Sequence, residues 1–189
     1  MNKLIAAIVA LGLGWGVALA QEAPKAEAAK PAEMAKPEAA APEAPKPQGP
    51  KYGKNVGDLA KPAAIKTFEG ADFDTGSIAK RSMFVFANSA CGMCARELAD
   101  LDKNFDKLGG LDVYLVVIDQ TKERAMEKFS QYQKNFKLLH DPDFKFGENV
   151  DFYQTPATLV LEKGGKIVFK GAGYRPDGLK AIVEAAKAL

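Results

Sequence analysis

Short, uninterrupted apolar runs alternate along the second part of the chain with segments in which apolar residues recur every three or four positions. The runs at Met83–Ala87 and Val113–Ile118 are typical of strands that are buried on both faces of a sheet. Between these runs, apolar residues recur at the spacing of a helix, up to a Gly-Gly pair: Leu98, Leu101, Phe105 and Leu108. The pattern therefore predicts a strand–helix–strand unit.

A second helix is predicted to begin after Thr121, which is a suitable N-cap. Its apolar face repeats at helical spacing and consists of Met126, Phe129 and Tyr132. The polar stretch His140–Asp143 follows, and we interpret it as a connection that holds His140, the only histidine of the chain, in a loop. We expect no catalytic role for this histidine.

Two strands and a final helix are predicted for the C-terminal part. The apolar runs Ala157–Leu161 and Ile167–Phe169 flank a Gly-Gly turn, which is typical of an antiparallel hairpin. Pro176 suits the first position of the last helix, whose apolar stripe consists of Leu179, Ile182, Val183 and Ala186. The predicted order β-α-β-α-β-β-α is that of a thioredoxin-like α/β fold, to which residues 51–81 are expected to add an N-terminal hairpin.

The beginning of the chain has the pattern of an export signal. An apolar stretch, Leu4–Val17, follows a lysine and precedes Ala18-Leu19-Ala20, whose small residues suit a cleavage site. We therefore interpret residues 1–20 as a secretory signal peptide. An uncleaved membrane anchor is the alternative, because the apolar stretch reaches the lower limit of a membrane-spanning length.

Residues 21–50 have a composition that cannot build a core. They are rich in Ala, Pro, Glu and Lys and contain no aromatic or β-branched residue, which predicts a disordered linker stiffened by proline. Residues 51–189 are then one domain of ordinary size. The net charge of +2 gives no reason to expect a nucleic-acid partner.

The chain has two cysteines, and both lie in Cys91-Gly92-Met93-Cys94, between the first predicted strand and its helix. At a helix start, the Cys91 sulfur lies near free N–H groups and the positive end of the helix dipole, which stabilise a thiolate. The spacing of the two cysteines brings Cys94 within bridging distance of Cys91. This spacing predicts a reversible disulfide: Cys91 attacks a disulfide in a partner and Cys94 resolves the mixed disulfide. The reverse reaction would oxidise a partner.

Three other uses of the cysteines fit less well. A disulfide that closes a four-residue loop removes little chain entropy, so it is a poor structural cross-link. A zinc site requires about four ligands, whereas the chain offers two cysteines and one distant His140. Attachment of a c-type haem requires a histidine where Ala95 stands. We expect neither a metal nor a cofactor.

With these features, about residues 53–189 resemble the exported thioredoxin-like thiol–disulfide oxidoreductases of the TlpA/ResA type. The resemblance is carried by Val56–Ala60, Phe84–Cys94, Cys94–Leu98, Asp141–Asp143, Thr155–Pro156 and Lys163–Lys166. It implies a central insertion between the cysteines and the C-terminal hairpin. It also implies a periplasmic protein, membrane-anchored if its N-terminal segment is uncleaved, that reacts with disulfide- or thiol-containing envelope proteins and receives electrons from a donor in the inner membrane.

The resemblance assigns roles to three further positions. Pro156 corresponds to a cis-proline that faces the cysteines, and Thr155 to the residue whose backbone docks the partner's extended peptide. Glu97, one turn past Cys94, corresponds to an acidic residue that exchanges a proton with that cysteine if it is partly buried. A trans proline at the start of a strand and a solvated helix glutamate are the ordinary alternatives.

The sequence departs from the TlpA/ResA type around the cysteines. Ala90 stands where the family usually has tryptophan, and Gly92-Met93 stands where it often has proline. Ala90 is expected to open the partner surface next to Cys91, and Met93 to offer an apolar contact there. These neighbours help to set the reduction potential, so the direction of electron flow stays open.

Three functions are compatible with these features. The first is reduction of envelope disulfides, for example in cytochrome c maturation. A thiol peroxidase of the peroxiredoxin kind is the second, but its chemistry requires a threonine where Asn88 stands and a proline where Phe84 stands. A non-catalytic thioredoxin-like binding or chaperone module is the third, and the presence of both cysteines argues against it.

Overall fold

A computed structural model describes residues 50–187. The signal peptide predicted for residues 1–20 lies outside the described residues, as does the predicted linker except for its last residue. The domain boundaries therefore stay a prediction. Between residues 50 and 187, no helix has the length and apolar character that crossing a membrane requires.

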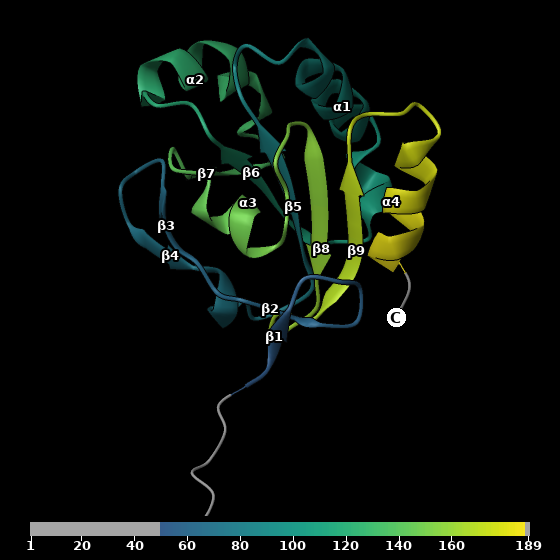
Figure 1. Cartoon of the computed structure of the whole chain (residues 1–189). Coiled ribbons are helices and arrows are strands. Elements are labelled where there is room, and N and C mark those ends of the chain that lie inside the picture. Colours follow the sequence, from purple (N-terminus) through teal and green to yellow (C-terminus); the bar gives the residue numbers. More distant parts are fainter. Residues whose placement is uncertain (1–49, 188–189) are drawn as a thin grey trace, which may run out of the picture. The chain divides into compact units, whose positions relative to one another are not determined.

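The described residues form a mixed sheet of seven strands in the order β4-β3-β7-β6-β5-β8-β9 (Figure 1). The strands are β3 (Ala64–Thr67), β4 (Asp72–Asp74), β5 (Ser82–Ala87), β6 (Asp112–Val117), β7 (Lys137–His140), β8 (Ala157–Leu161) and β9 (Ile167–Ala172). β5 lies between β6, which is parallel to it, and β8, which is antiparallel. Two short strands, β1 (Tyr52–Gly53) and β2 (Leu59–Ala60), form a separate parallel pair.

Helices cover both faces of the sheet (Figure 1). They are α1 (Gly92–Lys103), α2 (Lys122–Phe129), α3 (Lys145–Asn149) and α4 (Gly178–Lys187), with 3-10 turns at Thr75–Ser77, Phe105–Leu108 and Ser130–Tyr132. On one face α1, α2 and α4 pack on Met83, Val85 and Ala87 of β5. On the other face α3 and the N-terminal extension pack on Phe84 and Phe86. The alternation along β5 therefore separates a mainly aliphatic core from an aromatic one.

The predicted thioredoxin-like fold is confirmed, with the mixed sheet and its flanking helices. The expected N-terminal hairpin is formed by β3 and β4, which pair antiparallel. The expected C-terminal hairpin is formed by β8 and β9. Between β6 and β8, the chain inserts α2, β7 and α3.

The interpretation of His140 as a loop residue is wrong, because His140 is the last residue of β7. This strand was missed, and so was the five-residue helix α3. β7 has only four residues, too few to show a period. It is held by pairing with β6 on one side and β3 on the other, and these partners are distant in sequence.

Several predicted element ends also differ. The first helix ends at Lys103 instead of continuing to Leu108, because the Asn104 side-chain amide donates to the carbonyl of Asp100 at 2.8 Å and ends the helix there. Likewise, α2 ends before Tyr132, which lies in a 3-10 turn.

At the C-terminal end, β9 continues past its predicted end. Gly171 does not break this strand, because it pairs with Thr158 of β8. The last helix begins at Gly178 and not at Pro176. Pro176 and Asp177 lie in a turn in which the N–H of Gly178 donates to the carbonyl of Arg175 at 2.9 Å.

Candidate redox site

Cys91 and Cys94 form a disulfide at the start of α1, with their Cα atoms 5.2 Å apart. Cys91 is the N-cap of the helix, and its sulfur accepts a hydrogen bond from the N–H of Cys94 at 3.0 Å. Cys91 is partly exposed, whereas Cys94 is fully buried. The sulfur that a partner can reach therefore lies at the helix N-terminus, where backbone N–H groups stabilise a thiolate.

The residues just before Cys91 form a tight turn at the end of β5. The N–H of Cys91 donates to the carbonyl of Asn88 at 3.2 Å. The N–H of Ala90 donates to Oδ1 of the Asn88 side chain at 3.1 Å. Ala90 is exposed, which agrees with the expectation that it opens the surface next to Cys91.

Asp119, which follows β6, anchors this turn from the neighbouring strand. Its carboxylate accepts the N–H of Ser89 at 2.8 Å and also the Ser89 hydroxyl, and Asp119 is 8 % exposed. His140 Nε2 lies 2.8 Å from the carbonyl of Asp119 and donates to it. Our sequence analysis missed Asp119. The position of Asp119 just after β6 was a usable signal, because the carboxyl ends of adjacent parallel strands meet at one edge of a sheet. At this edge β5 ends in the redox turn, residues 88–91.

The Thr155–Pro156 peptide bond is cis, as the resemblance implied. The pairing of Phe86 with Ala157 places this turn beside the end of β5. The Asn88 amide then donates from Nδ2 to Oγ1 of Thr155 at 3.3 Å. The cis-proline turn is thereby joined to the segment that precedes Cys91. The docking role of Thr155 stays a prediction.

Glu97 lies on the second turn of α1 and is only 5 % exposed. Thr158 of β8 donates its hydroxyl to Glu97 Oε1 at 2.6 Å, whereas no described group bonds the other oxygen, Oε2. Burial raises the pKa of Glu97, and the hydrogen bond from Thr158 offsets only part of this effect. Glu97 is therefore buried, which was the condition for its expected proton exchange with Cys94. Thr158 was missed by our sequence analysis.

A cavity of about 270 Å³ lies beside Glu97. Its walls come from α1, β8, β9 and α4, and include Glu97, Asp100, Thr158, Phe169, Tyr174 and Arg175. The Tyr174 hydroxyl donates to the Asp100 carboxylate and so joins the β9–α4 turn to α1. Because Arg175 is exposed, the cavity reaches the surface.

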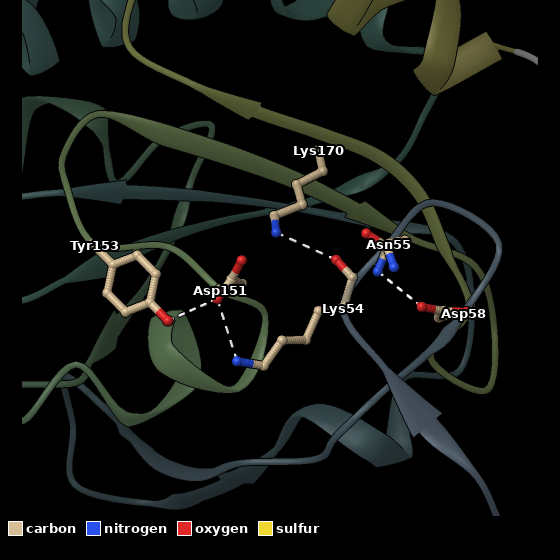
Figure 2. A network of polar contacts seen from close by, with 6 residues as sticks. All are labelled: Lys54, Asn55, Asp58, Asp151, Tyr153 and Lys170. Carbon is tan, nitrogen blue, oxygen red and sulfur yellow. Dashed lines mark hydrogen bonds and ion pairs between the residues drawn. The ribbon is translucent and has the colours of Figure 1, made fainter.

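A polar network fastens the N-terminal extension to the segment that leads into the cis-proline turn, and Figure 2 shows its members. Asp151 accepts hydrogen bonds from the Tyr153 hydroxyl at 2.7 Å and from Lys54 Nζ at 3.2 Å. Lys170 of β9 donates to the carbonyl of Lys54 at 3.2 Å. The Tyr153 side chain itself stays exposed, three residues before Pro156.

Comparison with protein families settles the family. Residues 56–170 match the AhpC/TSA family, which covers the sheet up to β9 and both cysteines. The chain belongs to the AhpC/TSA family. Family, fold and the Cys91–Cys94 disulfide together describe a thiol–disulfide oxidoreductase of the thioredoxin/AhpC-TSA type. A search of curated protein sequences finds no match.

Solved structures with the same fold come from several bacteria. A protein of Chlorobium tepidum assigned as the thiol:disulfide interchange protein DsbE has 22% identity and a TM-score of 0.58, covering 71% of this chain and 99% of its own. The thioredoxin domain of a Bacteroides vulgatus thiol-disulfide oxidoreductase has 21% identity and a TM-score of 0.57, covering 69% and 96%. A secreted disulfide oxidoreductase of Mycobacterium tuberculosis has 20% identity and a TM-score of 0.53, covering 65% and 95%. At these identities the likeness shows the fold.

The described residues of this AhpC/TSA family member bring two sulfurs and one buried carboxyl group close together at the start of α1. Within residues 50–187, no three His, Cys, Asp or Glu side chains are placed together to hold a metal ion. The site combines a partly exposed sulfur at a helix N-terminus, a buried second sulfur and a buried carboxyl group with one unbonded oxygen. Such a site can pass two electrons and two protons between a dithiol and a disulfide.

Proposed function

We propose that this protein reduces disulfides in exported partner proteins, in the manner of the TlpA/ResA type. The observation that carries the proposal is the placement of Cys91. Its sulfur is the more accessible one of the pair, it sits at the N-terminus of α1, and its turn is bonded to Thr155 of the cis-proline turn. A partner peptide that docks on Thr155 would present its disulfide to Cys91.

The first step consumes the reduced protein. The Cys91 thiolate attacks one sulfur of the partner disulfide, a mixed disulfide forms, and the other partner sulfur leaves as a thiolate that takes up a proton. The N–H of Cys94 donates to the Cys91 sulfur in the structure, and the same N–H stabilises the attacking thiolate.

The second step releases the partner. Cys94 passes its proton to the Glu97 carboxylate, and its sulfur attacks the Cys91 sulfur. The Cys91–Cys94 disulfide forms, and the second partner sulfur leaves as a thiolate that takes up a proton. Because burial raises the pKa of Glu97, its carboxylate is a stronger base than an exposed glutamate. The net exchange is one dithiol oxidised and one partner disulfide reduced.

A dithiol donor must then reduce the Cys91–Cys94 disulfide. The export signal read in residues 1–20 supports a periplasmic site of action. It also supports a donor that delivers electrons through the inner membrane. Envelope disulfides are the substrate class under this proposal, and apocytochrome c, which needs reduced cysteines to accept haem, is one member of it.

The decisive experiment uses the Cys94→Ser variant of the exported full chain in a bacterial envelope. Without the resolving sulfur, Cys91 should accumulate as mixed disulfides with its partners, which are seen as reducible high-mass species and identified by mass spectrometry. The Cys91→Ser variant is the matched control and should trap far less. If both variants trap nothing, the protein does not exchange disulfides with envelope proteins. Peroxide turnover that survives the loss of Cys94 would favour the peroxidase instead.

A further inference from the structure

The side chain of Asn88 uses both ends of its amide. Oδ1 accepts the N–H of Ala90 at 3.1 Å, within the turn that leads to Cys91. Nδ2 donates to the Thr155 hydroxyl at 3.3 Å, across to the cis-proline turn. Asn88 also accepts the N–H of Cys91 at its carbonyl, at 3.2 Å. One residue therefore contacts the nucleophile's turn and the residue next to Pro156.

The redox turn is held from its other side by a separate anchor. Ser89 bonds the Asp119 carboxylate through both its N–H and its hydroxyl. Asp119 is buried and follows β6, so this anchor does not depend on the cis-proline turn. Ser89 is held by Asp119, whereas Asn88 and Thr155 are only partly buried. The hydrogen bond between Asn88 and Thr155 is therefore the contact of the turn that a docked partner can influence.

We propose that Asn88 is a positioning residue that couples the docking of a partner peptide on Thr155 to the orientation of Cys91. The inference rests on the proposed reduction of protein disulfides. A peptide that pairs with the Thr155 backbone restricts the motion of its side chain, and the hydroxyl then holds the Asn88 amide in place. The amide in turn holds the N–H of Ala90 and the turn that aims the Cys91 sulfur. A small disulfide, which does not occupy the docking turn, gains nothing from this coupling.

The test is a double-mutant cycle with Asn88→Ala and Thr155→Val in the full-length protein, with insulin as protein disulfide and hydroxyethyl disulfide as small one. Valine keeps the shape of threonine and leaves the peptide-docking backbone intact. Thr155→Val should raise KM for insulin about fivefold, the effect of one lost hydrogen bond. Asn88→Ala also removes the bond to the N–H of Ala90, so it should raise KM at least as much. The double variant should show the same KM as Asn88→Ala alone, and not the product of the two single effects that is expected for independent sites. The rise in KM for hydroxyethyl disulfide should be smaller than the rise for insulin in every variant.

Two controls separate positioning from folding. Thr155→Ser keeps a hydroxyl, so its KM for insulin should stay close to the wild-type value and below that of Thr155→Val. Asn149→Ala removes another partly buried amide, which donates to the Pro62 carbonyl at 3.0 Å and lies outside the redox turn, and it should leave both KM values near wild type.

Three results would count against the inference. Multiplicative effects of the two substitutions would show that Asn88 and Thr155 act independently. Equal losses with both disulfides would show that Asn88 only maintains the turn. A wild-type protein that reduces hydroxyethyl disulfide but not insulin would overturn the proposed function itself, and the inference with it.

Discussion

Two buried carboxyl groups of this domain differ in their surroundings. Glu97 lies in α1 near the disulfide, and Asp141 lies just before α3. Glu97 is 5 % exposed and Asp141 is 2 % exposed, and burial raises the pKa of both. Their hydrogen bonds differ. Asp141 accepts the N–H of Lys145 at Oδ1 and that of Phe146 at Oδ2, both at 2.9 Å. Glu97 has a partner at one oxygen only within the described part of the chain.

We propose that the difference separates a structural carboxylate, Asp141, from one that acts in the redox step, Glu97. Asp141 accepts hydrogen bonds from two free N–H groups at the beginning of α3. Both of its oxygens are therefore occupied in holding the helix start. A buried polar atom without a partner is rare in folded proteins and costs free energy. Oε2 of Glu97 is that kind of atom, since no group within residues 50–187 bonds it, and Glu97 lines a cavity one helical turn from Cys94. Under our proposal this carboxyl group exchanges the proton of Cys94.

The largest effect is expected from Glu97→Gln. Glutamine keeps the size of the side chain and can accept the Thr158 hydroxyl, but it cannot take the proton of Cys94. The release of the partner from the mixed disulfide should slow about a hundredfold near neutral pH, which is the usual contribution of a positioned base. Stopped-flow measurement of the mixed-disulfide lifetime checks this.

The same variant has a second signature, in stability. Since the pKa of Glu97 is higher in the folded than in the unfolded chain, its stabilisation is complete at low pH and is lost as the pH rises through the raised value. Glu97→Gln removes that loss and should be at least as stable as wild type at pH 8. Lower stability together with slower chemistry would make Glu97 a structural residue like Asp141.

Asp141→Ala should have the opposite profile. It leaves the N–H groups of Lys145 and Phe146 without their acceptor, which should reduce the free energy of unfolding by about 1–3 kcal/mol. Disulfide exchange by the folded fraction should keep its wild-type rate. Urea unfolding gives the first quantity and insulin reduction the second. A loss of exchange without a loss of stability would contradict the distinction.

Thr158→Val should shift the pH dependence of the chemistry. The hydroxyl of Thr158 lowers the pKa of Glu97, so its removal raises that pKa further. The carboxylate form of Glu97 then appears at higher pH, and the rising limb of the rate–pH profile for partner release should move in the alkaline direction. A shift toward lower pH would exclude Glu97 as the base that the profile reports.

The smallest effect is expected from Asp151→Asn in the network of Figure 2. The hydrogen bond from Tyr153 and the ion pair with Lys54 lower the pKa of Asp151, but its side chain is 45% exposed. Solvent weakens such contacts. The unfolding midpoint in urea should move less than in Asp141→Ala. An equal shift would mean that the N-terminal extension contributes more to stability than surface contacts explain.

Local sequence patterns predicted the elements with strong periods. The buried runs became β5, β6 and β8, and the helical spacing past Cys94 became α1. The sequence did not predict β7 and α3, which have four and five residues, nor the two-residue strands β1 and β2. A strand of four residues has no readable period, and β7 exists because β6 and β3 pair with it.

The cysteine spacing was readable in the chain, and the disulfide agrees with it. The cis bond at Pro156, which the structure confirms, and the roles for Glu97 and Thr155 came from a family resemblance. The sequence alone does not show whether a helix glutamate is buried. The partners of these residues depended on contacts between distant segments. Thr158 meets Glu97 across 61 positions, Asn88 meets Thr155 across 67, and Ser89 meets Asp119 across 30.

Chemistry carried by neighbouring residues was therefore encoded locally. The two cysteines, the helix that begins between them and the strand that precedes them need only a few positions each, because short-range geometry decides them. Whether Glu97 is buried, which of its oxygens is bonded and what holds the redox turn were decided by the folded sheet. Burial and hydrogen-bond partners are set by which segments the packed core brings together, and that is a property of the whole domain.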